Sequence, residues 1–200
     1  MRIGIIGAGN VGGTLARKLA TCGYDILLGV RDPHSSKAQT AQAPGIRLGS
    51  PEEATAYGEV VIVAIPLSAA GSLLPTLNLA GKIVIDTTNA FDGLPDGYSS
   101  AAAAITDWAK GAQVVKAFNA TPWEALADPV YNGMTVETFI CGDDAGKRVA
   151  AQLARDVRFI VVDVGGLANA ALTENLAKLW GTIAYQGGAG RNFAFKMVRR

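Results

Sequence analysis

The chain has 200 residues, half of them hydrophobic and 18% charged, so it is long enough for one domain with a substantial core. Its 18 basic and 17 acidic residues leave a formal net charge of +1, which gives no broad field for binding nucleic acid or an anionic membrane. The two distant cysteines, Cys22 and Cys141, and the single histidine, His34, predict neither a disulfide framework nor a metal site nor a Ser-His-Asp triad. The 24 glycines make up 12% of the chain, against a usual level of about 7%, and this excess requires an explanation.

Seven short aliphatic runs along the chain are typical of β-strands. They cover residues 3–6, 26–30, 60–65, 82–86, 113–118, 137–140 and 159–162. Most of these runs are continuously apolar rather than alternating, which favours strands that are covered on both faces. The pattern therefore predicts a mainly parallel sheet.

Six segments between and after the strands have helical patterns. They cover residues 11–21, 51–57, 67–74, 99–110, 143–155 and 169–185. The last segment has an apolar stripe that we expect to face the core, formed by Leu172, Leu176, Leu179 and Ile183. Together the elements predict an α/β fold of the Rossmann type, doubly wound, with a small C-terminal helical extension.

Residues 60–81 carry no charge, and this length raises the question of a membrane span. Pro66 and Pro75 divide the stretch, so we expect a strand and short helical pieces instead. The apolar N-terminus is interrupted by glycines and is not read as a signal peptide. We therefore expect a cytoplasmic protein with no membrane partner and no nucleic-acid partner.

A glycine-rich motif, G-x-G-x-x-G, follows the first strand and opens the first helix. It consists of Gly7, Ala8, Gly9, Asn10, Val11 and Gly12. In such a motif the first glycine permits a tight turn, the second lets a pyrophosphate approach the backbone, and the third allows close packing of helix and strand. The N–H groups at the helix start then attract phosphate. The motif predicts dinucleotide binding; a glycine-rich turn without a ligand is the alternative.

The end of the second strand bears on which dinucleotide binds. An NAD enzyme would present a carboxylate to the ribose here, whereas this chain has Val30 followed by Arg31. An arginine can pair with the 2′-phosphate of NADP, and Lys37 and His34 lie within loop reach. These residues favour NADP(H). Asp32 would favour NAD if the register slipped by one residue, and Arg31 could equally be a solvated loop charge.

Three further strand ends are expected to line the nicotinamide side, because ligands of open α/β sheets bind outside the carboxyl ends of the strands. The candidate contacts are Ala64, Ile65, Pro66, Leu67, Thr88, Asn89 and Asn119. Pro66 could equally serve only to end its strand, and the two asparagines could be turn residues.

Several segments together resemble the NADPH:F420 oxidoreductases, also called F420-dependent NADP reductases. The likeness covers residues 1–12, 29–31, 65–66, 140–144, 163–169 and a tail near 187–196. It implies a Rossmann domain with a small C-terminal piece and usually a homodimer. It also implies hydride transfer between NADPH and a deazaflavin, coenzyme F420, at the carboxyl edge of the sheet. We accordingly expect residues 1–165 to bind NADP, and 166–200 to form a helix and tail packed on that domain as an acceptor or dimer region.

No histidine, lysine or carboxylate pair is predicted as a catalytic group, so none is assigned. Hydride transfer between two cofactors requires stacked rings and little proton chemistry from the protein. The tail glycines at 187, 188 and 190 could approach a flat ring, or form an ordinary loop. Arg191 and Lys196 could meet an anionic cofactor tail.

Other functions remain open on the sequence alone. A flavin or ferric reductase, similar to the oxidoreductase domain of membrane metalloreductases, would pass electrons to a soluble acceptor. A relative of pyrroline-5-carboxylate reductase would need a helical dimerisation domain, and only 35 residues follow Gly165. A non-enzymatic NADP-binding sensor would also explain the missing acid and base groups.

Overall fold

The structure is a computed structural model that describes residues 1–198 and 200. The strands are β1 (Arg2–Ile6), β2 (Asp25–Gly29), β3 (Ile46–Gly49), β4 (Val60–Val63), β5 (Ile83–Asp86), β6 (Gln113–Lys116), β7 (Val130–Tyr131), β8 (Met134–Thr135), β9 (Glu137–Gly142) and β10 (Ile160–Asp163). The α-helices are α1 (Asn10–Thr21), α2 (Ser36–Ala41), α3 (Pro51–Tyr57), α4 (Leu67–Leu73), α5 (Ala101–Trp108), α6 (Trp123–Ala127), α7 (Asp144–Asp156) and α8 (Ala170–Gly181). Short 3₁₀ turns occupy Leu74–Thr76 and Leu167–Asn169, and a π-helical turn, Thr182–Gln186, extends α8.

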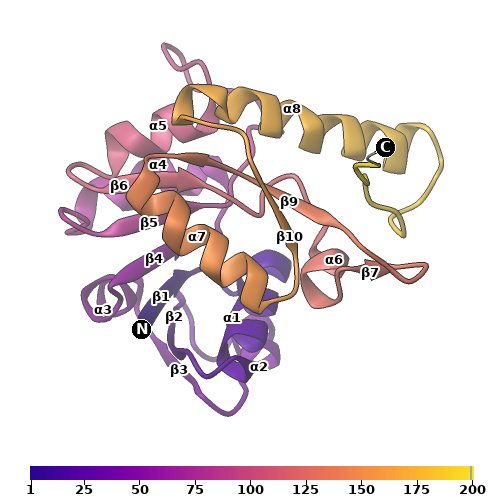
Figure 1. The fold of residues 1–200 in the computed structure, drawn as a ribbon. Coiled ribbons are helices and arrows are strands. Elements are labelled where there is room, and N and C mark those ends of the chain that lie inside the picture. Colours follow the sequence, from indigo (N-terminus) through magenta and orange to yellow (C-terminus); the bar gives the residue numbers. More distant parts are fainter. Residues whose placement is uncertain (199) are drawn as a thin grey trace.

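Eight of the strands form one sheet in the order β10-β9-β6-β5-β4-β1-β2-β3, while β7 and β8 form a separate hairpin. Within the large sheet all neighbours are parallel except β6 and β9. Helices cover both faces of the sheet (Figure 1). The predicted Rossmann-type α/β fold with a mainly parallel sheet is therefore confirmed.

Alternation along the strands divides the core between the two faces. Ile3 and Ile5 of β1 belong to one cluster with residues of α1, α2, α6 and α7, whereas Ile6 belongs to a second cluster with α4 and α5. Gly4 faces α3, and a Cβ there would lie 2.1 Å from the carbonyl oxygen of Ala54. Because both faces are covered, β1 and β4 are almost continuously buried, as their apolar sequences predict.

The uncharged stretch 60–81 forms β4, α4 and a 3₁₀ turn, as Pro66 and Pro75 predict. Pro66 is the N-cap of α4, and Pro75 lies at the start of the 3₁₀ turn. Across the residues that the structure describes, no helix is long and apolar enough to cross a membrane.

Four short elements were not predicted from the sequence: α2, β3, α6 and the β7–β8 hairpin. Helix α2 buries only Ala38 and Ala41, and β3 has only one buried residue, Ile46. Such short elements bury too few apolar residues to leave a periodic pattern. Contacts with α1 and β2 stabilise α2, β3 and α6, and the two strands of the hairpin contact each other.

The expected orientation of the last helix was wrong. Leu172 and Leu179 are 65% and 50% exposed. The buried face of α8 consists instead of Ala170, Thr173, Glu174, Ala177 and Trp180. The apolar periodicity predicted the helix correctly but predicted the wrong buried face. Small residues and a paired glutamate make the inward contacts instead.

Substituting Gly4 with alanine tests how closely α3 packs on the sheet. The new methyl group would overlap the backbone of α3, so we expect a loss of about 2 kcal/mol in the free energy of unfolding. Denaturant titration measures this loss. Gly166→Ala is the matched control, since a Cβ at Gly166 meets no atom within 4 Å. Equal stability of the two variants would contradict the packing argument.

Candidate functional site

The glycine-rich motif lies where β1 meets α1. Gly7 has a φ of +106°, and Gly9 is the N-cap of α1. No side chain caps this helix start, and its first turn contains no acidic residue. The first N–H groups of α1 therefore remain oriented toward the carboxyl edge of the sheet, where they can bind an anion.

The three motif glycines differ in what a side chain would meet. A Cβ at Gly7 would lie 2.5 Å from the carbonyl oxygen of Ala64, and one at Gly12 would lie 2.0 Å from that of Gly7. At Gly9 a Cβ would meet no protein atom within 4 Å. Packing within the protein therefore explains Gly7 and Gly12, while Gly9 leaves open space beside the helix start that fits a bound pyrophosphate.

The loop after β2 and the first turn of α2 present three basic residues to solvent: Arg31 and His34 in the loop and Lys37 in the helix. Val30 is buried and its N–H donates to the carbonyl oxygen of Gly49 at 2.8 Å. The carboxylate of Asp32 accepts the backbone N–H of His34 at 2.8 Å. Asp32 thus shapes the loop, which weakens the argument that it binds a ribose.

The ends of β4, β5 and β6 are joined by side chains. The hydroxyl of Thr87 donates to the carbonyl oxygen of Val63 at 2.9 Å. Asn89 donates to the carbonyl oxygen of Asn119 at 2.9 Å, and the side chain of Asn119 donates back to that of Asn89 at 3.0 Å. Thr88 Oγ1 and Asn119 Oδ1 are buried and have no hydrogen-bond partner among the residues that the structure describes. The predicted nicotinamide-side residues Thr88, Asn89 and Asn119 therefore lie together at this edge.

The remaining predicted contacts at β4 follow the strand directly. The N–H of Ala64 continues the β-ladder to Ile6 at 2.9 Å, and Leu67 is buried in α4. The carbonyl oxygen of Pro66 accepts the N–H groups of Ala69 and Ala70. Pro66 therefore has a structural role at the start of α4, whether or not it also contacts a ring.

A buried charge cluster lies beneath this edge and was missed by sequence reasoning. The ammonium group of Lys116 is fully buried and lies 2.8 Å from Asp86 Oδ2 and 2.9 Å from Glu174 Oε1. It also donates to the carbonyl oxygen of Thr88 at 2.5 Å. A lysine within the predicted strand at 113–118 was the available sequence signal. Its partner Glu174 is 58 residues away, so no local pattern links them.

A cavity of about 630 Å³ opens at the carboxyl edge and is called the carboxyl-edge pocket here. Its walls come from the start of α1, the ends of β5 and β6, α6, α8 and the following turn, and the C-terminal tail. Five aromatic side chains line it: Phe91, Phe118, Trp123, Trp180 and Tyr185. Phe118 has a φ of +61°, which is rare for a residue with a side chain. A pocket of this composition suits a flat, conjugated ring.

The tail closes one side of this pocket. Trp180 donates its indole N–H to the carbonyl oxygen of Phe193 at 2.9 Å, and the two rings stack. Arg191 forms two bonds to Glu124, at 2.6 and 2.8 Å, and Lys196 lies 2.6 Å from Glu137. Both cations are therefore paired with carboxylates of the protein.

The Arg191 pairing also affects the titration of Glu124. Burial alone would raise the pKa of this carboxyl, but the bonds from Arg191 outweigh burial and lower it below its usual value. The thiol of Cys141, which lies near Lys116, has a pKa raised to about 11, mainly by burial. This thiol is therefore protonated and unreactive at neutral pH.

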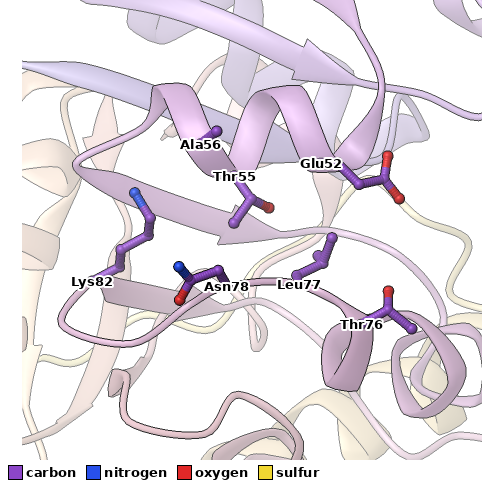
Figure 2. Close-up of a pocket in the computed structure, with 7 residues that line it drawn as sticks. All are labelled: Glu52, Thr55, Ala56, Thr76, Leu77, Asn78 and Lys82. Carbon is purple, nitrogen blue, oxygen red and sulfur yellow. The ribbon is translucent and has the colours of Figure 1, made fainter.

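A second hollow, of about 400 Å³, lies at the opposite edge of the sheet, between α3 and the loop before β5. Figure 2 shows Glu52 and Lys82 at its two ends, with Thr55 between them. The amine of Lys82 donates to the carbonyl oxygen of Gly58 at 2.6 Å. None of the predicted site residues lines this hollow. The candidate functional site is the carboxyl edge.

Fold and edge geometry together define a Rossmann-type dinucleotide-binding protein. Residues 2–90 match the sequence model of the family described as NADP oxidoreductase, coenzyme F420-dependent. The F420-dependent NADP reductase of Methanothermobacter marburgensis is 28% identical over 205 residues, covering 90% of both chains. The predicted resemblance is confirmed: the chain is similar to the F420-dependent NADP reductases over nearly its whole length.

Two other similarities support and extend this relationship. A crystal structure of a proposed F420-dependent NADP reductase from Arthrobacter sp. FB24 matches with a TM-score of 0.86 and 27% identity, covering 98% of this chain and 99% of that one. Metalloreductase STEAP3 of Rattus norvegicus is 31% identical over 178 residues, which cover 86% of this chain. The chain spans only 36% of that protein's length and 35% of metalloreductase STEAP2.

Proposed function

We propose that the protein is an NADPH-dependent oxidoreductase that transfers hydride between NADP(H) and a second redox cofactor, with coenzyme F420 as the first choice. The open space at Gly9 carries the proposal, because it adjoins the start of α1 and no protein contact requires a glycine there. The carboxyl-edge pocket, which reaches the start of α1, provides room for an acceptor ring. The names of the reductases similar to this chain support the choice of F420.

The proposed arrangement assigns three groups of residues to NADP(H). The pyrophosphate lies over the motif glycines and the start of α1, and the adenosine end lies by Val30, Arg31 and Lys37. The nicotinamide end lies beside Ala64, Ile65, Pro66, Leu67, Thr88, Asn89 and Asn119. The two buried oxygens without partners, Thr88 Oγ1 and Asn119 Oδ1, are suited to accept hydrogen bonds from a ligand at that end.

The chain itself then binds the two cofactors, aligns their rings and excludes water from them. A reduced nicotinamide supplies the hydride when it is bound. The joined ends of β4, β5 and β6 hold one ring in place, and the aromatic walls of the pocket exclude water from the other. No side chain is assigned as a proton donor or base.

In this proposal residues 1–165 form the NADP-binding domain and residues 166–200 form the acceptor and dimer region. The supporting contacts are those of Trp180 and the tail at the pocket. We propose a homodimer, since Leu172 and Leu179 expose an apolar face on α8. A cytoplasmic location is also proposed, in keeping with the free thiols of Cys22 and Cys141.

A ferric or flavin reductase is the second candidate, because the metalloreductases match the chain over a comparable length. Measuring NADPH oxidation against F420, FMN, a ferric chelate and pyrroline-5-carboxylate in parallel distinguishes the candidates. We expect turnover with F420 above all others. Turnover confined to FMN or ferric chelate would move the assignment to the second candidate. Micromolar NADPH binding without any turnover would indicate a sensor.

Substituting Gly9 with alanine tests the pyrophosphate position. The protein has room for the new methyl group, so the unfolding free energy should stay unchanged. The methyl would occupy the space of the pyrophosphate, and NADPH should bind at least about tenfold more weakly, a loss of roughly 1.4 kcal/mol. Calorimetric titration measures this. Gly166→Ala is the control, and unchanged NADPH affinity in Gly9→Ala would remove the main support for this site.

Substituting Arg31 with alanine tests cofactor choice. Loss of a charge-assisted bond to the 2′-phosphate should weaken NADPH binding about tenfold and leave NADH binding unchanged. Fluorescence titration with both nucleotides measures the two affinities. Arg148→Ala, an exposed position on α7, is the control and should alter neither. If the unsubstituted protein binds NADPH and NADH equally, the 2′-phosphate argument fails.

A further inference from the structure

Helix α8 forms one wall of the carboxyl-edge pocket through Ala177, Lys178 and Trp180. The first part of its inward face, by contrast, consists of small side chains, Ala170 and Thr173, with Glu174. Small side chains bury little apolar surface and allow a helix to slide or tilt at small cost. Glu174 is the charged residue of this inward face, and it is only 3% exposed.

Both carboxylate oxygens of Glu174 are bonded to other elements. Oε1 lies 2.9 Å from the ammonium of Lys116 and accepts the N–H of Ala102 at 3.1 Å. Oε2 accepts the N–H of Ala101 at 2.9 Å. One side chain of α8 therefore binds the end of β6 and the start of α5, where the helix dipole favours a negative charge.

Lys116 connects Glu174 to the end of β5 and to the segment that follows it. Its ammonium group also binds Asp86 and the carbonyl oxygen of Thr88, and Asp86 accepts the N–H of Thr88 at 2.7 Å. The three N–H donors of Lys116 are thus shared among α8, β5 and the segment that follows β5. The position of α8 and the position of Thr88 are fixed by the same ammonium group.

Within one chain the outward face of α8 adds no anchor among the described residues, because Leu172 and Leu179 are largely exposed. Contacts of that face in the proposed homodimer would add to the link through Glu174. Beyond Glu174, the helix is held at its far end by Trp180 and the tail. The wall residues Ala177 and Lys178 lie between these two attachments, three and four residues after Glu174. Any rotation of α8 about its axis would move them relative to Asn89 and Asn119.

We propose that Glu174 is a positioning residue that sets the acceptor-binding wall of the carboxyl-edge pocket by fixing α8 to Lys116. The inference rests on the proposed function, in which this pocket holds the acceptor ring. Glu174 does not touch the ring in this account. It determines the distance between the wall on α8 and the strand ends, and so the alignment of the acceptor.

Glu174→Gln tests the proposal, because the amide keeps the size of the side chain while removing the charge and placing an N–H group against other donors. The Michaelis constant for the acceptor should rise about tenfold through misalignment, while NADPH affinity stays within about twofold of the original. Hydrogen exchange of the backbone amides at 170–181 should become faster. A purely structural role would lower the active fraction and kcat without raising that Michaelis constant.

Glu59→Gln is the matched control. The carboxylate of Glu59 also accepts a backbone N–H and pairs with a cation, both of Arg2, and it does not line the pocket. It should leave both the exchange at 170–181 and the acceptor Michaelis constant unchanged. Glu174→Asp, which keeps the charge on a shorter side chain, serves if the glutamine variant does not fold, and should show the same effects at smaller size.

Two results would overturn the inference. One is unchanged exchange at 170–181 together with an unchanged acceptor Michaelis constant in both Glu174 variants. The other is an equal loss of acceptor and NADPH affinity, which would show a general disturbance of the fold. Failure of the proposed function would look different: the unsubstituted protein would turn over no acceptor, while hydrogen exchange would still report whether Glu174 fixes α8.

Discussion

The burial of one ammonium group, that of Lys116, constrains the whole carboxyl edge. A buried cation is tolerated only when nearby acceptors satisfy it, and here two carboxylates and a backbone carbonyl do so. The two carboxylates leave a formal excess of one negative charge, which the N–H groups at the start of α5 help to balance. Sheet, α5 and α8 are thereby held together by charge beside a small apolar cluster of Ala102, Cys141 and Ala170.

Two different kinds of surface adjoin each other at the carboxyl edge of the sheet. The start of α1 offers bare N–H groups and an open space at Gly9, which suit an anion. The adjoining pocket is aromatic, and the charge of Arg191 beside it is neutralised by Glu124. The near-neutral composition of the chain is consistent with this division: backbone N–H groups provide for the anion, and internal pairs hold the walls.

Much of the sheet could be predicted because its strands are buried on both faces, and continuous runs such as Val60–Val63 then follow directly from composition. The glycine motif could be predicted because its residues are adjacent in sequence. The charge cluster could not, since Asp86, Lys116 and Glu174 lie on three separate elements. The same holds for the pairing of Arg191 with Glu124 across 67 residues.

By itself, the sequence determined the Rossmann-type fold, the glycine-rich turn between β1 and α1 and the likeness to F420-dependent NADP reductases, because each is encoded in residues that are neighbours along the chain. Only the tertiary structure decided which face of α8 is buried, what Asp32, Arg191 and Lys196 contact within the chain, and where the carboxyl-edge pocket opens. The physical reason is that a helix with a leucine stripe buries it only when an apolar surface is available. Here the surface facing α8 holds a buried lysine, and the helix turns its glutamate toward it.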